Sequence, residues 1–192
     1  MKFFIALLIC CASSTIFAQS LSKHNDPKAH PNLTNKTFAQ KIAGKPITYY
    51  LNHRSVGEIA KLFYKGEFAA SDDASTFSVI DSVLTHNKDT HPFYFFLFNQ
   101  MMKVSDGALA EYVGEISGKY LKEFPCEFVR FADDKIYGVD LKQWGGFAAF
   151  NLDGPDAVKS YIDSIEIVVN RDCPKAKETW HKVSKLIEGT EN

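Results

Sequence analysis

Apolar side chains recur every three or four residues along most of the chain beyond Thr37, the spacing that places them on one face of an α-helix. The clearest example follows Ser105, a residue type suited to cap a helix. One face of this segment comprises Leu109, Tyr112, Val113, Ile116 and Tyr120, and the other carries Glu111, Glu115, Lys119 and Glu123. We therefore expect an amphipathic helix after this serine.

Seven further helix starts are indicated by capping residues and by prolines. They are the capping-box sequence 55–58, Asp73, His91-Pro92, Pro125, Asp140, Gly154-Pro155 and Asp172. The region between Asp133 and Asp153 is the weakest, because Gly145-Gly146 disfavours a helix there. A strand or an irregular loop is an alternative for that region.

These elements predict an all-α fold of about six to eight stacked amphipathic helices. The starts are similarly spaced, but no residue-level repeat relates one helix pair to the next. Both an irregular α-α stack and a compact helical bundle fit this pattern, and an α+β fold is the remaining alternative. We expect a single α-helical domain over residues 38–192.

The first 18 residues have the layout of a secretory signal peptide. Lys2 precedes the ten-residue apolar run Phe3–Ala12, and a small-residue-rich stretch leads to a cleavage site after Ala18. The apolar run is too short to span a bilayer, which takes about 20 residues. The alternative of a lipoprotein would acylate Cys10 or Cys11. We expect a periplasmic or extracellular protein.

A polar segment, residues 19–37, follows the signal peptide and contains Pro27 and Pro31. We interpret it as a flexible lead-in to the domain. Cleavage would leave two cysteines, Cys126 and Cys173, and an even number in an oxidising compartment predicts one disulfide. The alternative is a reactive thiol, because both cysteines lie at expected helix starts, where the helix dipole lowers a thiol pKa.

Charge and composition exclude several classes of partner. The chain has 192 residues with 22 basic and 23 acidic side chains, so it offers no basic surface for nucleic acid or for an anionic membrane. With 45% apolar residues it is too hydrophobic to remain disordered. A compact globular protein is the expectation that remains.

The most hydrophobic internal segment runs from Phe93 to Met102. A helix that is apolar on every side must be buried on every side, so we expect a central core helix. Two alternatives stay open: a buried β-strand, and a groove for an apolar small molecule. The groove would be walled by Phe95, Phe98, Met101 and Met102.

A second candidate for binding is the sequence Trp144-Gly145-Gly146-Phe147, followed by Phe150. Aromatic residues beside flexible glycines can form a recognition loop for a partner. They can equally pack onto neighbouring helices, with glycine permitting a close approach. The binding hypothesis singles out Trp144, Phe147 and Phe150.

Catalytic and metal-binding patterns are absent from the sequence. There is no GxSxG, GxxxxGK[ST] or GxGxxG motif. His86 and His91 lie five residues apart without the further ligands that zinc requires, and adjacent acidic pairs such as Asp133-Asp134 are accounted for as helix caps. We therefore predict no catalytic residue, no metal and no cofactor.

The function expected from these features is binding of a protein partner by an exported helical protein. The first alternative is a binder of an apolar small molecule. The second is a hydrolase whose catalytic residues are dispersed along the sequence. We expect neither nucleic-acid binding nor stable membrane insertion after the signal peptide is removed.

Overall fold

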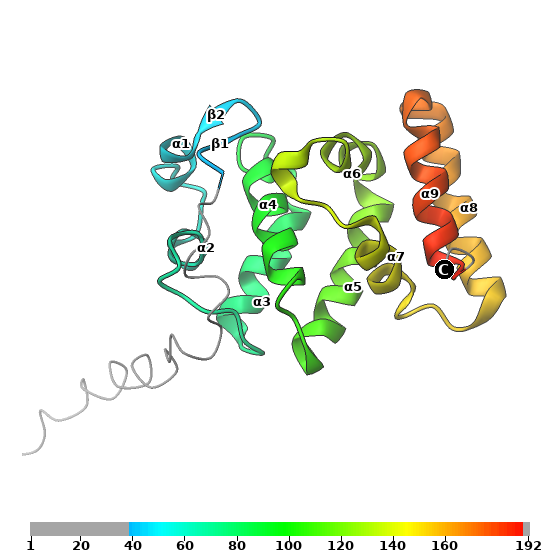
Figure 1. Cartoon of the computed structure of the whole chain (residues 1–192), viewed down its shortest axis with the longest axis horizontal. Coiled ribbons are helices and arrows are strands. Elements are labelled where there is room, and N and C mark those ends of the chain that lie inside the picture. Colours follow the sequence, from blue (N-terminus) through cyan, green and yellow to red (C-terminus); the bar gives the residue numbers. More distant parts are fainter. Residues whose placement is uncertain (1–38, 190–192) are drawn as a thin grey trace, which may run out of the picture.

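The computed structural model describes residues 39–189 and shows an all-α stack (Figure 1). The predicted signal peptide (1–18) and polar lead-in (19–37) lie outside the described residues. Within that range there are nine α-helices, eight of them at least seven residues long. The predicted fold class is therefore confirmed.

The chain enters through an antiparallel hairpin of β1 (Lys41–Ile42) and β2 (Lys45–Pro46). The elements of the first half are then α1 (Ile47–Leu51), α2 (Glu58–Lys65), α3 (Ala74–Asp81), the 3₁₀ turn η1 (Ser82–Leu84), α4 (His91–Met102) and α5 (Gly107–Glu123). The second half comprises α6 (Pro125–Ala132), the 3₁₀ turn η2 (Lys135–Tyr137), α7 (Leu141–Ala149), α8 (Gly154–Asp172), the 3₁₀ turn η3 (Pro174–Ala176) and α9 (Lys177–Ile187). The hairpin and α1 lie at one end of the long axis, and α8 with α9 at the other (Figure 1).

Most predicted helix starts are confirmed. The Asp73 carboxylate accepts a hydrogen bond from the Thr76 amide at 2.8 Å, and that of Asp140 accepts one from the Gln143 amide at 3.1 Å. Helices also begin at His91-Pro92, at Pro125 and at Gly154-Pro155. Proline is tolerated at these positions because the first turn of a helix leaves its amides unpaired.

The predicted caps at Ser55 and Ser105 are wrong. Helix α2 begins after Gly57, whose amide donates to the Tyr94 hydroxyl at 3.0 Å, so a tertiary contact holds this turn. Helix α5 begins after Asp106, and the Ser105 hydroxyl instead donates to the Met102 carbonyl at the end of α4.

The predicted cap at Asp172 is also wrong. This residue is the last of α8, and its carboxylate is paired with the Arg171 guanidinium. Pro174 begins the 3₁₀ turn η3, and α9 follows only at Lys177.

The glycine-containing segment after Asp140 is a helix rather than a strand or loop. A Cβ atom at Gly145 of α7 would lie 2.5 Å from the Cβ of Leu186 on α9. A Cβ atom at Gly114 of α5 would lie 3.2 Å from the Phe147 carbonyl oxygen on α7. The two glycines thus allow α7 to pack tightly between α5 and α9, and this packing offsets the low helix propensity of glycine.

Helix α4 forms the centre of the hydrophobic core, and all twelve of its residues are buried. The Phe93 ring stacks on Tyr50 of α1, and the Phe95 ring stacks on Trp144 of α7. The core-helix interpretation of Phe93–Met102 is confirmed, and the strand alternative is wrong.

The disulfide between Cys126 and Cys173 is confirmed, with the two Cα atoms 5.7 Å apart. It joins the first turn of α6 to the residue that follows α8. The α8–α9 pair is therefore covalently tied to the centre of the molecule.

Candidate functional site

A pocket of about 490 Å³ lies where the β1–β2 hairpin, the turn before α4, and α6 with η2 meet. We call it the hairpin pocket. Its uncharged walls include Tyr50, Pro92, Phe131 and Tyr137, and its charged groups are Lys45, Lys88, Glu127, Arg130 and Asp134. Pockets of this volume accommodate small ligands or single side chains of a partner.

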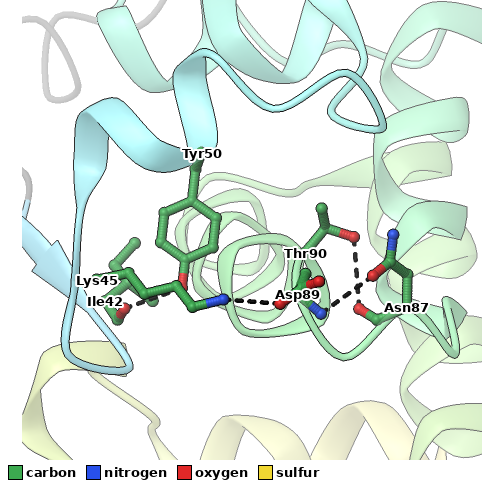
Figure 2. Close-up of polar contacts among 6 residues, drawn as sticks. All are labelled: Ile42, Lys45, Tyr50, Asn87, Asp89 and Thr90. Carbon is green, nitrogen blue, oxygen red and sulfur yellow. Dashed lines mark hydrogen bonds and ion pairs between the residues drawn. The ribbon is translucent and has the colours of Figure 1, made fainter.

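The hairpin supplies one side of the pocket. Its two-residue turn places Ala43 (φ 49°) and Gly44 (φ 76°) in the left-handed region, as in type I′ turns. The Tyr50 hydroxyl donates to the Ile42 carbonyl at 2.9 Å, which fixes the hairpin to α1 (Figure 2). Burial raises the pKa of Tyr50, so this hydroxyl stays protonated and keeps its hydrogen bond.

The turn before α4 forms the adjoining side. The Asn87 side-chain oxygen accepts from the Asp89 amide at 3.0 Å, and the Asn87 backbone carbonyl accepts from the His91 amide at 2.8 Å. This arrangement holds the Asp89 carboxylate 2.8 Å from the Lys45 ammonium (Figure 2). The hydrogen bond with Asp89 raises the pKa of Lys45, whose charge is thus compensated within the protein.

His91 lies at the base of the pocket and is only 5% exposed. Its Nε2 atom is 3.0 Å from the Tyr120 hydroxyl, and its ring packs 4.7 Å from that of Phe124. Burial lowers the pKa of His91 to about 4, so the imidazole is neutral at neutral pH. The base of the pocket therefore carries no positive charge.

Helix α6 and the turn η2 supply the opposite wall. Glu127 and Arg130 lie one turn apart on α6, whose buried side chains Phe128 and Phe131 anchor the helix in the core. Asp134 caps η2 by accepting from the Ile136 amide at 3.0 Å. Glu127 and Asp134 are half-buried, whereas Arg130 is exposed.

The charges of the pocket differ in how they are compensated. Lys45 is paired with Asp89, but Lys88, Glu127 and Arg130 form no ion pair with any residue between 39 and 189. Arg130 instead places its guanidinium 4.9 Å from the Phe131 ring centroid. The hairpin pocket thus gathers charged residues of both signs that have no ion-pair partner in residues 39–189, above aromatic side chains that are at most 3% exposed.

The candidate binding residues of α4 lie in the core rather than on a surface. Phe95 and Met101 are 0% exposed, and Phe98 and Met102 are 1% exposed. Their side chains fill the space between α4 and its neighbours, and none of them lines the hairpin pocket. An apolar ligand would reach them only by displacing core packing.

The three candidate residues in and just after α7 differ in how deeply their side chains are buried. Trp144 is fully buried, and its indole Nε1 donates to the Asn99 side-chain oxygen at 2.8 Å. Phe147 is half-buried, and Phe150, just after α7, is 58% exposed. Of the seven binding candidates, Phe150 is therefore the most accessible to a partner, followed by Phe147.

Sequence reasoning missed the hairpin pocket. His91 was recognised only as a helix start and as half of a weak histidine pair, Asp134 only as a cap, and Glu127 and Arg130 not at all. The sequence feature that points to the pocket is the pair of opposite charges Glu127 and Arg130, three residues apart on α6. This helix begins at Pro125, and its aromatic residues are buried.

Residues 39–189 contain no candidate metal site and no candidate membrane-spanning helix. In that range, no three side chains of His, Cys, Asp or Glu come together as a metal site would require. The same part of the chain contains no helix with both the length and the apolar character needed to cross a bilayer.

Comparison with known proteins adds no relative. The chain matches no protein-family model, no curated protein and no solved structure. The function must therefore be argued from the geometry of the hairpin pocket.

Proposed function

We propose that this protein is exported and acts by binding a protein partner through the face that carries the hairpin pocket. The observation that carries the proposal is a set of three charged residues at a concave site, Lys88, Glu127 and Arg130, which form no ion pair within residues 39–189. Charged groups left unpaired at a surface supply specificity and fast association once a partner of complementary charge pairs with them.

The surroundings of the pocket support protein recognition. Ile136 of η2 is 41% exposed and lies next to pocket-lining Tyr137, so an apolar side chain adjoins the charged groups. Aromatic and arginine side chains are the residue types enriched where binding energy concentrates in protein interfaces. Arg130 is the exposed residue of this kind at the hairpin pocket, whereas its aromatic residues Tyr50, Phe131 and Tyr137 are at most 3% exposed.

Export is supported by the leader sequence and by the disulfide. A disulfide that closes a 47-position loop persists in an oxidising compartment, and it is compatible with a periplasmic or extracellular location. Fractionation of the native cells tests this part, with the intact mass of the isolated protein as the readout. A chain that begins at Gln19 with no free thiol supports it, and a full-length cytoplasmic chain with two free thiols at 126 and 173 contradicts it.

Quantitative affinity capture tests the binding proposal. The bait is the mature protein, compared with a charge-swapped pocket variant, Glu127→Lys with Arg130→Glu. The matched control swaps a pair on α9 far from the pocket, Glu178→Lys with Lys182→Glu, whose ion pair is preserved in reverse. We expect one stoichiometric partner with the wild type and the control and its loss with the pocket variant. Equal capture by all three contradicts the pocket face as the binding surface.

A further inference from the structure

We propose that a groove between α8 and α9 is a second binding site, which takes a neutral amide group through its carbonyl oxygen. The site is distinct from the hairpin pocket and does not depend on the function proposed for that pocket. It rests on one buried donor, the indole Nε1 of Trp180, which has no hydrogen-bond partner in residues 39–189.

The groove lies at the end of the molecule opposite the hairpin, where α8 and α9 pack against each other (Figure 1). Its volume is about 430 Å³. The residues that each helix contributes are spaced three or four apart, so they share one face of that helix. We call it the α8–α9 groove, and its lining includes Glu166 and Asn170 from α8 and Lys177, Trp180, His181 and Ser184 from α9.

Two residues of α9 form the floor of the groove. Trp180 is 3% exposed and Ser184 is 8% exposed, whereas the other four residues named above are exposed and form its walls. The Ser184 hydroxyl donates to the His181 carbonyl at 2.9 Å, so its proton is already engaged. The Trp180 indole is the donor of the floor that is left over.

The unpaired indole sets this groove apart from the rest of the structure. Among the buried side-chain nitrogen and oxygen atoms of residues 39–189, Trp180 Nε1 is the one without a partner. The other tryptophan, Trp144, donates to the Asn99 side-chain oxygen at 2.8 Å. A buried donor without a partner costs free energy, because it has lost water and gained nothing in exchange. An acceptor that enters the groove and reaches Trp180 offsets this cost.

The chemistry of the floor favours a neutral acceptor. An indole N–H only donates, so a cation that carries donors alone cannot pair with it. A carboxylate would lose its hydration for a single neutral donor, which costs more than the same burial of an amide. The free charges of the walls do not compensate for this, because Glu166 opposes Lys177, and Glu178 is already paired with Lys182 at 3.0 Å.

The walls supply partners for the remaining part of an amide group. The Glu166 carboxylate accepts hydrogen bonds, and the Asn170 side chain both donates and accepts. Neither has a side-chain hydrogen bond with another residue between 39 and 189. Both side chains are exposed and change rotamer freely, so they can turn toward the N–H group of a ligand whose carbonyl oxygen meets Trp180.

The experiment is an NMR titration of the mature protein with four small probes. Propionamide represents the amide of an asparagine or glutamine side chain, and N-methylpropionamide represents a main-chain peptide group. Propionate and propionamidinium are the anionic and cationic counterparts of similar shape. We expect both amides to shift the Nε1–H signal of Trp180 downfield. The signal of Trp144, which is already bonded to Asn99, should stay in place.

Two variants assign the interaction, with binding followed on the backbone amide signal of Asn170. Trp180→Phe keeps an aromatic ring in the floor and removes the donor, so it should weaken amide binding about tenfold. The matched control Glu166→Gln removes a charge from the wall and keeps an acceptor. It should leave amide binding within about twofold of the wild type.

The inference is overturned if no amide moves the Trp180 signal, as expected when a structural water alone meets this donor. It is also overturned if Trp180→Phe binds the amides like the wild type, or if propionate or propionamidinium binds as tightly as propionamide. Tighter binding of N-methylpropionamide supports the carbonyl of a peptide main chain as the natural ligand group, and tighter binding of propionamide supports a side-chain amide. None of these probes enters the capture experiment on the hairpin pocket, so the two proposals stand or fail separately.

Discussion

The centre of the molecule and the hairpin pocket differ in whether their polar side chains have partners within the protein. Between α4 and α7 the buried polar atoms are satisfied: Trp144 donates to Asn99, which in turn donates to the Phe95 carbonyl at 2.8 Å. At the pocket, Glu127 and Arg130 lie on one helix turn and remain unpaired within residues 39–189. Polar groups between α4 and α7 hold the core together, whereas we propose that Glu127 and Arg130 contact another molecule.

The largest expected effect comes from the disulfide that joins α6, one wall of the hairpin pocket, to the end of α8. Replacing Cys126 and Cys173 with alanine removes a cross-link over 47 positions, and the chain-entropy model assigns it a loss of about 4 kcal/mol in the free energy of unfolding. Urea denaturation of the wild type and the double variant measures this loss. Because α6 is also anchored by Phe128 and Phe131, we expect the folded variant to keep the pocket and bind its ligand normally. If the folded double variant loses ligand binding, the prediction that the disulfide affects stability but not the pocket is wrong.

The next effect concerns His91, a buried titratable group that lines the pocket and belongs to the core helix α4. The pKa of His91 is about 4 in the folded protein against 6.5 ordinarily, so the unfolded chain binds more protons between these values. Stability is therefore complete above pH 6.5 and falls as the pH drops toward 4. The histidine contributes about 3 kcal/mol to this loss.

Chemical denaturation across pH 4 to 7 checks the histidine. The wild type should lose more stability over this range than His91→Gln, which lacks the titrating group. Parallel profiles for the two proteins would show that His91 does not titrate in the way that its burial implies.

A smaller effect compares the two tryptophans. Trp144→Phe leaves the buried Asn99 oxygen without its donor and should cost about 2 kcal/mol. Trp180 of α9 is the matched control, because its Nε1 is buried without a hydrogen-bond partner in the described chain. Trp180→Phe removes an unsatisfied donor and should cost less. Equal losses in thermal or urea denaturation would contradict the account of the core.

The helical elements could be predicted because their signals are local. Asp73 and Asp140 cap helices through side chains that bond three residues ahead, and Pro92, Pro125 and Pro155 lie in first turns. The predicted cap at Ser55 is wrong because the turn before α2 is held by Tyr94, which lies 39 positions away. A tertiary contact of this kind leaves no local pattern.

The pocket could not be predicted, for a related reason. Its residues come from segments between Ala43 and Tyr137 that meet only when the hairpin folds over α4. The hairpin itself has two residues per strand and an Ala43-Gly44 turn, without the Asn-Gly signature that usually marks a type I′ turn. On α6, the residues Glu127 and Arg130 resemble an ordinary solvated helix face until the pocket beside them is known.

The smallest expected effect on stability is the most informative one for the pocket. Glu127→Gln removes a carboxylate that stabilises no other group in residues 39–189 as an ion-pair or hydrogen-bond partner, so the free energy of unfolding should change by less than about 0.5 kcal/mol. A loss of more than this amount in urea denaturation would place Glu127 among the groups that hold the fold together.

The most direct test of the central claim is isothermal titration of the captured partner into the wild type and into Glu127→Gln. We predict that the variant, folded and as stable as the wild type, binds its partner about tenfold more weakly, because the proposed binding face loses one of its charged groups. Identical affinities for the two proteins would contradict that claim.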